Sequence, residues 1–295
     1  SFLGKKFEAP LFVSGMTGGT EKAKKINQEI ALAVEKFRLG MGVGSQRAMI
    51  ENPQVSETYF VREQMPTAFL TGNVGVAQLA EYSIEKIEWA VNKIKADALA
   101  IHMNSAQEAV QKEGDTNFKE GLEHIKKIVQ TLKIPVYVKE VGNGIDRETA
   151  KALAKANVAA IDIQGAGGTS WIGVEVQRKK SDVGEAYWDF GIPTAVSLIN
   201  CRKVFDGPII ASGGIRTGHE VLKALVLGAD LAGMARPIFM AQQENGTQRV
   251  ESLFNRLIEE IKTGMFLVGA KNLKELKKVK YVITGKTKQW LDQTR

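Results

Sequence analysis

The 295-residue chain has little of the chemistry that secreted, metal-dependent or membrane proteins rely on. Its one cysteine, Cys201, can form no intrachain disulfide, which is typical of the reducing cytoplasm. We find no zinc-binding spacing, and no apolar run approaches the roughly 20 residues of a membrane span. The first residues show neither an initiator methionine nor a signal-peptide pattern, so we expect residues to be missing upstream. The sequence therefore predicts a cytoplasmic protein without a membrane partner.

Motifs for nucleic-acid binding are also absent. The net charge is +7 and the pI is about 9.3, but the lysines are scattered, with small clusters at 22–25, 126–127 and 271–280. Most of these clusters are typical of solvated helix faces, and no RNA-binding signature or basic and aromatic stripe accompanies them. We expect no nucleic-acid partner, and the surplus charge remains compatible with an anionic substrate.

Eight short apolar runs alternate with amphipathic stretches along the chain. The helical pattern over 21–38 places Ile26, Ile30, Val34 and Phe37 on one face, and 147–156 follows Asp146, a good N-cap. A last helical pattern covers 248–267. The apolar runs cover 10–14, 39–43, 68–73, 98–103, 136–141, 159–164, 208–211 and 231–234. This alternation predicts an α/β fold, a single (β/α)8 TIM barrel domain over residues 1–295. An open doubly wound sheet usually has its phosphate-binding glycines after the first strand, whereas the strongest such loop here follows the seventh.

The fourth apolar run ends in a cluster of polar side chains within residues 97–115. His102, Asn104, Gln107 and Glu108 follow the strand directly, with Glu113 and Asp115 further on. Because the carboxyl ends of barrel strands carry the chemistry of this fold, we expect an active-site rim here. Two carboxylates so close together first suggest acid–base catalysis.

Glycine-rich loops follow several of the other predicted strands. Gly213 and Gly214 separate the seventh strand from a helix, and Ala235 and Arg236 follow the eighth, which is where this fold usually binds phosphate. Glycines at 15–19 would let the backbone lie along a flat ring system. The long segment 165–190 is predicted to be a loop that acts as a lid.

Two basic side chains also end predicted strands. Arg47, after the second strand, suits a diphosphate because a guanidinium makes bidentate contacts to such oxygens. Lys139 ends the fifth strand, where it could stabilise negative charge on a reduced flavin. Loops of this kind are shared by several flavin mononucleotide barrels, so they indicate a cofactor class and leave the reaction open.

The motifs SGMTGGT, GVGSQRA, TGNVG, IHMNSAQEAVQKEGD, VKEVGNGI, GAGGTSW, WDFGIPTA, ASGGIRTG and GMARP occur in this order from residue 14 to 237. Together they resemble the type 2 isopentenyl diphosphate isomerase family, which uses FMN to convert isopentenyl diphosphate into dimethylallyl diphosphate. The resemblance implies an isomerase in which reduced FMN acts as the acid–base group, NADPH reduces the flavin and Mg²⁺ binds the diphosphate. It also implies a homo-oligomer of four or eight chains.

The resemblance also implies roles for individual residues. Gln107, Lys139, His102 and Asn104 would be catalytic, and Glu108 would bind Mg²⁺. FMN would contact Met16, Thr17, Gly18, Ser45, Asn73, Lys139, Thr169, Gly213, Gly214, Ala235 and Arg236. The substrate would contact Ser45, Gln46, Arg47, His102, Asn104, Gln107, Trp171 and Glu175. Two departures stand out: the N-terminal Arg-Lys and His of the family would lie upstream of Ser1, and Gln164 stands where the family commonly has serine.

Three alternatives remain open. An FMN-dependent α-hydroxy acid oxidase-like barrel needs a histidine base and an arginine, and the loop QGAGGTSW after the sixth strand has no histidine. An inosine monophosphate dehydrogenase-like enzyme needs a nucleophilic cysteine in a glycine-rich loop, whereas Cys201 lies in a predicted helix, where we expect a buried core thiol. A non-catalytic phosphate-binding barrel would bind no flavin and turn over no isopentenyl diphosphate.

Overall fold

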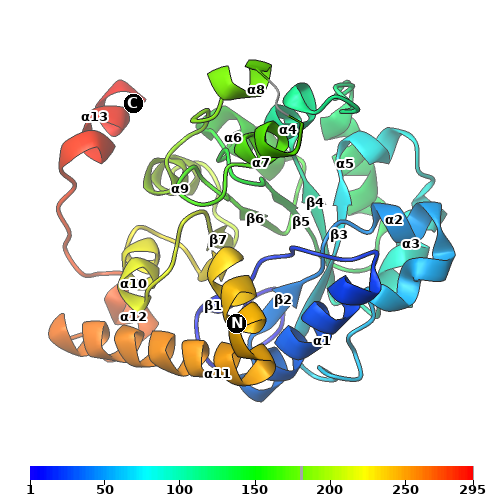
Figure 1. Ribbon diagram of the computed structural model, residues 1–295. Coiled ribbons are helices and arrows are strands. Elements are labelled where there is room, and N and C mark those ends of the chain that lie inside the picture. Colours follow the sequence, from blue (N-terminus) through cyan, green and yellow to red (C-terminus); the bar gives the residue numbers. More distant parts are fainter. Residues whose placement is uncertain (180–181, 295) are drawn as a thin grey trace.

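A computed structural model describes residues 1–179 and 182–294, and it contains a closed barrel of eight parallel strands (Figure 1). The strands pair in chain order, and β8 returns to pair with β1. They are β1 (Leu11–Val13), β2 (Gly40–Gly42), β3 (Phe69–Gly75), β4 (Ala98–His102), β5 (Val136–Lys139), β6 (Ala160–Asp162), β7 (Ile209–Ala211) and β8 (Leu231–Met234). The predicted (β/α)8 barrel is confirmed, and each strand falls on its predicted apolar run, with β3 two residues longer at its end.

Several helices begin where the sequence offers a capping side chain. Thr20, Asp146 and Thr217 each accept a hydrogen bond from a backbone N–H of the first turn that follows. The helices are α1 (Glu21–Lys36), α2 (Arg47–Glu51), η1 (Pro53–Thr58), η2 (Ala77–Ala80), α3 (Ile84–Lys93), α4 (Ser105–Val110), α5 (Gly121–Thr131), α6 (Arg147–Lys155), α7 (Trp171–Lys179), α8 (Asp182–Ala186), α9 (Thr194–Arg202), α10 (Gly218–Val226), α11 (Arg236–Leu267), α12 (Leu273–Leu276) and α13 (Gly285–Gln293). Cys201 is buried in α9, as expected.

One expectation about local structure was wrong. The segment 165–190 is not a plain loop, because α7 and α8 form within it; residues 180 and 181 lie outside the described part. The predicted last helix over 248–267 is confirmed: the backbone of α11 breaks at Asn245 and Gly246, so the part that follows the break matches the predicted range, and a further helical part from Arg236 precedes it. Within the described residues, no helix is both long and apolar enough to cross a bilayer.

Inside the barrel, the strands bury an apolar layer below a polar one. Phe12, Phe69, Tyr137 and Ile210 form a core cluster of their own, which Phe2 joins from the amino ends of the strands. Because strand side chains alternate between two faces, positions on the same face further toward the carboxyl ends belong to the same lumen. Those positions are Ser14, Asn73, His102, Lys139, Asp162 and Ser212, all buried.

Two equivalent arginine–aspartate ion pairs, four strands apart, hold the amino end of the barrel, and we call each of them a clamp. Arg62 pairs with Asp97 (2.6 Å), directly before β4, and Arg202 pairs with Asp230 (2.9 Å), directly before β8. Each aspartate also accepts a backbone N–H from the neighbouring strand, at 2.8 Å in β3 and 2.9 Å in β7. Both clamps therefore fix strand ends on the side of the barrel opposite the polar layer.

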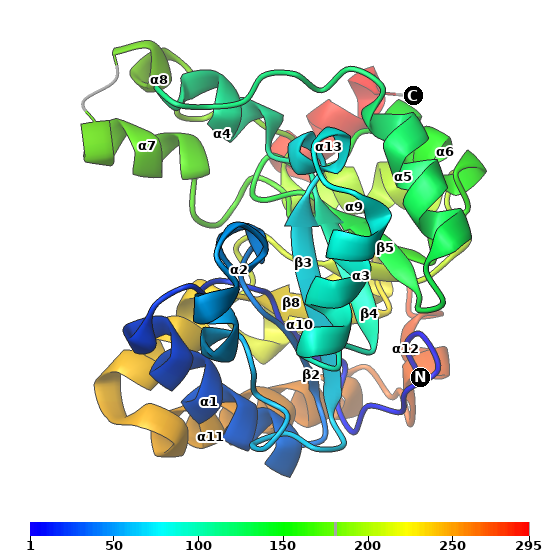
Figure 2. The same cartoon turned by 90° about the vertical axis from the view of Figure 1, so that its right-hand side faces the viewer.

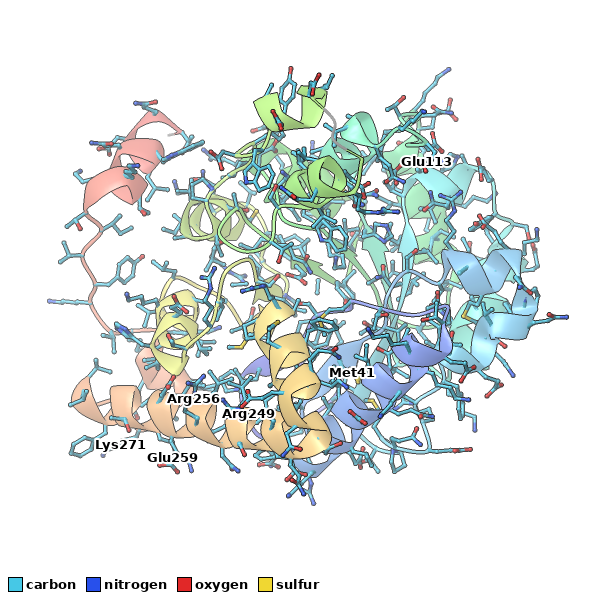
Figure 3. All side chains as sticks on the ribbon, in the orientation of Figure 1. Met41, Glu113, Arg249, Arg256, Glu259 and Lys271 are labelled. Carbon is cyan, nitrogen blue, oxygen red and sulfur yellow. The ribbon has the colours of Figure 1, made fainter. Side chains whose placement is uncertain are left out.

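The carboxyl end faces α4, α7 and α8, toward which the arrowhead of β3 points in Figure 2. Figure 3 shows Glu113 on that side, while Arg249, Arg256 and Glu259 line α11 on the far side of the molecule. On α11, Arg249 pairs with Glu244 and Arg256 with Glu260. These basic groups are thus a paired helix surface and lie away from the barrel mouth.

Candidate active site

His102 ends β4 in register with Lys139 on β5, and its ring is held by Asn73 on β3. The His102 Nδ1 lies 2.8 Å from Asn73 Oδ1, while Asn73 Nδ2 donates to the carbonyl of Val43 (3.2 Å). The Asn73 oxygen is then the acceptor, so His102 carries its proton on Nδ1 and offers Nε2 as an acceptor. Burial, aided by the charge of Lys139, lowers the pKa of His102 to about 3. His102 is therefore a neutral imidazole at physiological pH.

Lys139 is buried beside two carboxylates. Its Nζ donates to the backbone carbonyl of Glu140 (2.7 Å). Burial lowers the pKa of Lys139, and the negative charges of Asp162 and Glu140 oppose that shift. The Glu140 carboxylate accepts three backbone N–H groups of the loop that follows it, at 2.6 to 2.9 Å. The charge of Lys139, at the end of β5, is therefore stabilised by the negative charges of Asp162 and Glu140.

Asp162 is a member of this site that the sequence analysis missed. It pairs in register with Lys139, is fully buried, and accepts hydrogen bonds from Ser212 Oγ (2.6 Å) and Gln164 Nε2 (3.1 Å). Burial raises the pKa of Asp162, and the charge of Lys139 and these hydrogen bonds work against that rise. A lone carboxylate within the apolar run 159–164 was the available signal.

The rim residues of α4 come together as the sequence predicts. Asn104 Nδ2 donates to Glu108 Oε1 (2.8 Å), and the backbone N–H of Asp115 donates to Glu108 Oε2 (2.8 Å). Gln107 Nε2 donates to Glu175 Oε1 on α7 (3.2 Å). Glu175 is almost fully buried and also pairs with the half-exposed Arg178. The first turn of α4 is therefore fixed both to its own following loop and to α7.

The loops after β1 and β2 are held together by side chains that no motif indicated. A Cβ on Gly18 would lie 1.9 Å from the Tyr59 ring, so only glycine fits against it. The Tyr59 hydroxyl donates to the carbonyl of Ser45 (2.7 Å), and Asn27 Nδ2 donates to the carbonyl of Thr17 (3.0 Å). Tyr59 and Asn27 are both buried. They position two loops that carry predicted FMN contacts.

The prediction that Gln46 faces the substrate is wrong. Its side chain has no exposed surface: Nε2 donates to the carbonyl of Ala90 (2.8 Å), and Oε1 accepts the N–H of Asn73 (3.0 Å). A side chain with both ends engaged inside the protein holds structure and has no group left for a ligand. Its neighbour Arg47 is exposed and pairs with Glu51 (2.8 Å), and this bond raises the pKa of Arg47.

The loops after β6 and β7 form a backbone cradle. Gly213 and Gly214 have φ of 105° and 88°, and a Cβ on them would lie 2.1 Å from Gly165 O and 2.3 Å from Gly167 O. The N–H groups of Gly213, Gly214 and Ala235 donate to no described acceptor. Such N–H groups, close to a helix start, suit a phosphate.

The remaining predicted contacts lie around this cradle. Arg236 is exposed at the start of α11, and Met16 is partly buried after β1. Thr169 and Trp171 are exposed after β6, Trp171 by 36%. Ser14 Oγ, in the polar layer of the lumen, is buried without a described partner. A buried hydroxyl of this kind fits a polar ligand, so the residues present are compatible with FMN.

A magnesium ion would need oxygen ligands from outside the chain. Among the described residues, no three histidine, cysteine, aspartate or glutamate side chains gather into a metal site. Mg²⁺ commonly binds through one or two carboxylates together with substrate phosphate oxygens and water. Glu108, with its two oxygens each oriented by one hydrogen bond, is compatible with such a shared site.

The sequence is similar to a known protein family and to named enzymes. Residues 62–282 match the family described as FMN-dependent dehydrogenase. The isopentenyl-diphosphate delta-isomerase of Pyrococcus furiosus is 46% identical over 304 residues, covering 99% of this chain and 77% of that protein. The enzyme of the same name from Archaeoglobus fulgidus is 43% identical over 296 residues, covering 99% and 85%.

Solved structures share the fold at low sequence identity. A mandelate oxidase variant has a TM-score of 0.68 at 15% identity, covering 95% of this chain and 81% of that one. A flavocytochrome b2 variant with sulfite bound has a TM-score of 0.68 at 19% identity, covering 98% and 75%. At these identities the likeness concerns the barrel alone.

Proposed function

We propose, from the premise that this chain belongs to the FMN-dependent isopentenyl-diphosphate delta-isomerase family, that it converts isopentenyl diphosphate into dimethylallyl diphosphate. As a member of that family the chain is an isomerase. One structural observation supports the proposed substrate most strongly. The barrel mouth has a backbone cradle for one phosphate group at β7 and β8 and a separate polar rim at β4. A flavin phosphate and a substrate diphosphate can then be bound at different places.

In this proposal, the cradle at Gly213, Gly214 and Ala235 holds the FMN phosphate. Met16, Thr17 and Gly18 would line the ring system, with Lys139 beneath it in the lumen. When bound and reduced, FMN supplies the acid–base group that protonation of an unactivated alkene requires. His102 would not compete with the flavin as a proton donor, because its ring is neutral and its Nδ1 proton is engaged with Asn73.

The rim of β4 would bind the diphosphate and orient the hydrocarbon. Glu108 would share Mg²⁺ with the diphosphate oxygens, and Arg47 would add positive charge from α2 by exchanging Glu51 for the substrate. Gln107, fixed by Glu175, would orient the reacting carbons. Trp171, partly exposed at the start of α7, offers an apolar wall.

The test uses purified protein and its visible spectrum. We expect yellow protein that isomerises isopentenyl diphosphate with Mg²⁺ only after reduction by dithionite or NADPH, loses activity in air and regains it with reductant. Flavin-free protein serves as the control, and activity in that sample would refute the proposed mechanism. Bleaching of the oxidised flavin by a 2-hydroxy acid without other reductant would instead favour an oxidase. The NADPH requirement, the cytoplasmic location, the single-domain organisation and a homo-oligomer of four or eight chains stay predictions.

A further inference from the structure

Asp162 and Ser212 form a polar pair in the barrel lumen to which the proposed reaction assigns no task. Asp162 lies on β6 in register with Lys139 on β5, and Ser212 follows β7 directly. Asp162 is 0% exposed and Ser212 2%, so neither side chain reaches solvent. Ser212 Oγ donates to Asp162 Oδ1 at 2.6 Å, and Gln164 donates to the other carboxylate oxygen at 3.1 Å. Both donors stabilise the ionised form of Asp162.

A buried carboxylate also needs a positive charge nearby, and Lys139 is the cation that acts on Asp162. The titratable groups that interact electrostatically with Lys139 lie at the ends of three adjacent strands: His102 ends β4, Glu140 follows β5 directly, and Asp162 ends β6. His102 is neutral. The charge of Glu140 is already stabilised by three backbone N–H groups of its own loop. Burial raises the pKa of both carboxylates, and among the influences that oppose this rise the charge of Lys139 is the largest at Asp162 and the smallest at Glu140. The charge of Asp162 is therefore the more dependent on Lys139.

We propose that Asp162, held by Ser212, is a positioning residue that keeps Lys139 protonated where the flavin binds and thereby sets the pH dependence of the bound flavin. This inference rests on the proposed function, because it needs FMN in the barrel mouth. Lys139 is buried, and a buried lysine without a nearby anion loses its proton at a lower pH. A neutral Lys139 could no longer stabilise negative charge on a reduced flavin. Asp162 therefore acts through Lys139 without touching the reacting atoms.

The experiment compares FMN-loaded wild type with Asp162→Asn, which keeps the shape of the side chain and removes its charge. The midpoint potential and absorption spectrum of the bound flavin are measured from pH 6 to 10. Deprotonation of Lys139 should change the potential and the absorption of the bound flavin, and we call the pH at the midpoint of this change the flavin transition. We expect this transition to lie about 1 to 3 pH units lower in Asp162→Asn than in wild type. Adding Lys139→Met to Asp162→Asn should abolish the transition, which assigns it to the lysine.

Asp97→Asn is the matched control, because it makes the same substitution in a barrel aspartate at the opposite end of the strands. It should leave the flavin transition where it is in wild type. Ser212→Ala is a second probe should Asp162→Asn fail to fold; it should shift the transition in the same direction by less. Wild-type protein that binds no FMN would refute the proposed function. Bound FMN with an unmoved transition in these variants would refute this inference alone.

Discussion

The phosphate cradle yields a prediction whose size follows from backbone geometry. Gly214 has φ of 88°, and a Cβ there would lie 2.3 Å from Gly167 O. Gly214→Ala places an L residue in the left-handed backbone region, which would lower the free energy of unfolding by about 1–2 kcal/mol. Relief of the clash requires backbone movement, because the obstructing atom is a main-chain oxygen, and overpacking of this kind costs about 1–3 kcal/mol. We expect the free energy of unfolding to fall by about 2–5 kcal/mol in total.

Gly4 provides the matched control, because its φ of 85° is nearly the same and a Cβ there meets nothing within 4 Å. Gly4→Ala should therefore cost only about 1–2 kcal/mol. The movement that relieves the clash displaces the Gly214 N–H from a bound phosphate, and each 1.4 kcal/mol lost raises the Kd about tenfold. We expect Gly214→Ala to weaken FMN binding about 10- to 100-fold, measured by fluorescence titration, with urea unfolding in parallel. Equal stability and equal FMN affinity in the two variants would refute the proposed cradle.

Three further predictions concern the rest of the site. Glu108→Gln should raise the Mg²⁺ concentration needed for half-maximal activity at least tenfold, whereas an unchanged requirement would exclude Glu108 as a ligand. Tyr59→Phe keeps the ring but loses the hydrogen bond to Ser45, so FMN binding should weaken by about 1 kcal/mol; unchanged affinity in the titration would show that this bond does not shape the loop. The pKa of His102 is 6.5 in the unfolded chain and about 3 in the folded chain. The unfolded chain therefore binds more protons between these values, and the free energy of unfolding falls as the pH falls from 6.5 toward 3. His102→Asn should remove up to about 2 kcal/mol of the loss between pH 6.5 and 5, measured by urea unfolding, and an identical pH slope would contradict a buried neutral histidine.

The predicted site residues that the structure brings together at the barrel mouth share a local signal. His102, Asn104 and Glu108 follow one apolar strand, and in a parallel barrel every strand end reaches the same mouth. The glycines after β7 were recognisable for a similar reason, since positive φ and close backbone contact are properties of the loop itself. The predicted metal and diphosphate role of Glu108 comes from the family resemblance alone and stays a prediction.

Other residues could be placed only by the tertiary structure. Gln46 lies in a motif that resembles a substrate loop. Its side-chain amide, however, donates to the carbonyl of Ala90 on α3 and accepts the N–H of Asn73 on β3. Tyr59 shows no pattern in the sequence, yet its ring meets Gly18, 41 positions earlier in the chain. Such contacts join distant segments, so periodicity and turn chemistry carry no information about them.

By itself, the sequence determined the number and order of the strands, the glycine loops and the polar rim after β4. These features depend on periodicity and backbone conformation within a few residues. Only the tertiary structure decided which side chains share the barrel lumen, that Asp162 lies beside Lys139, and that α7 packs on α4 through Gln107 and Glu175. Register and closure set those neighbours, and both arise from contacts between strands and helices that are far apart in the chain.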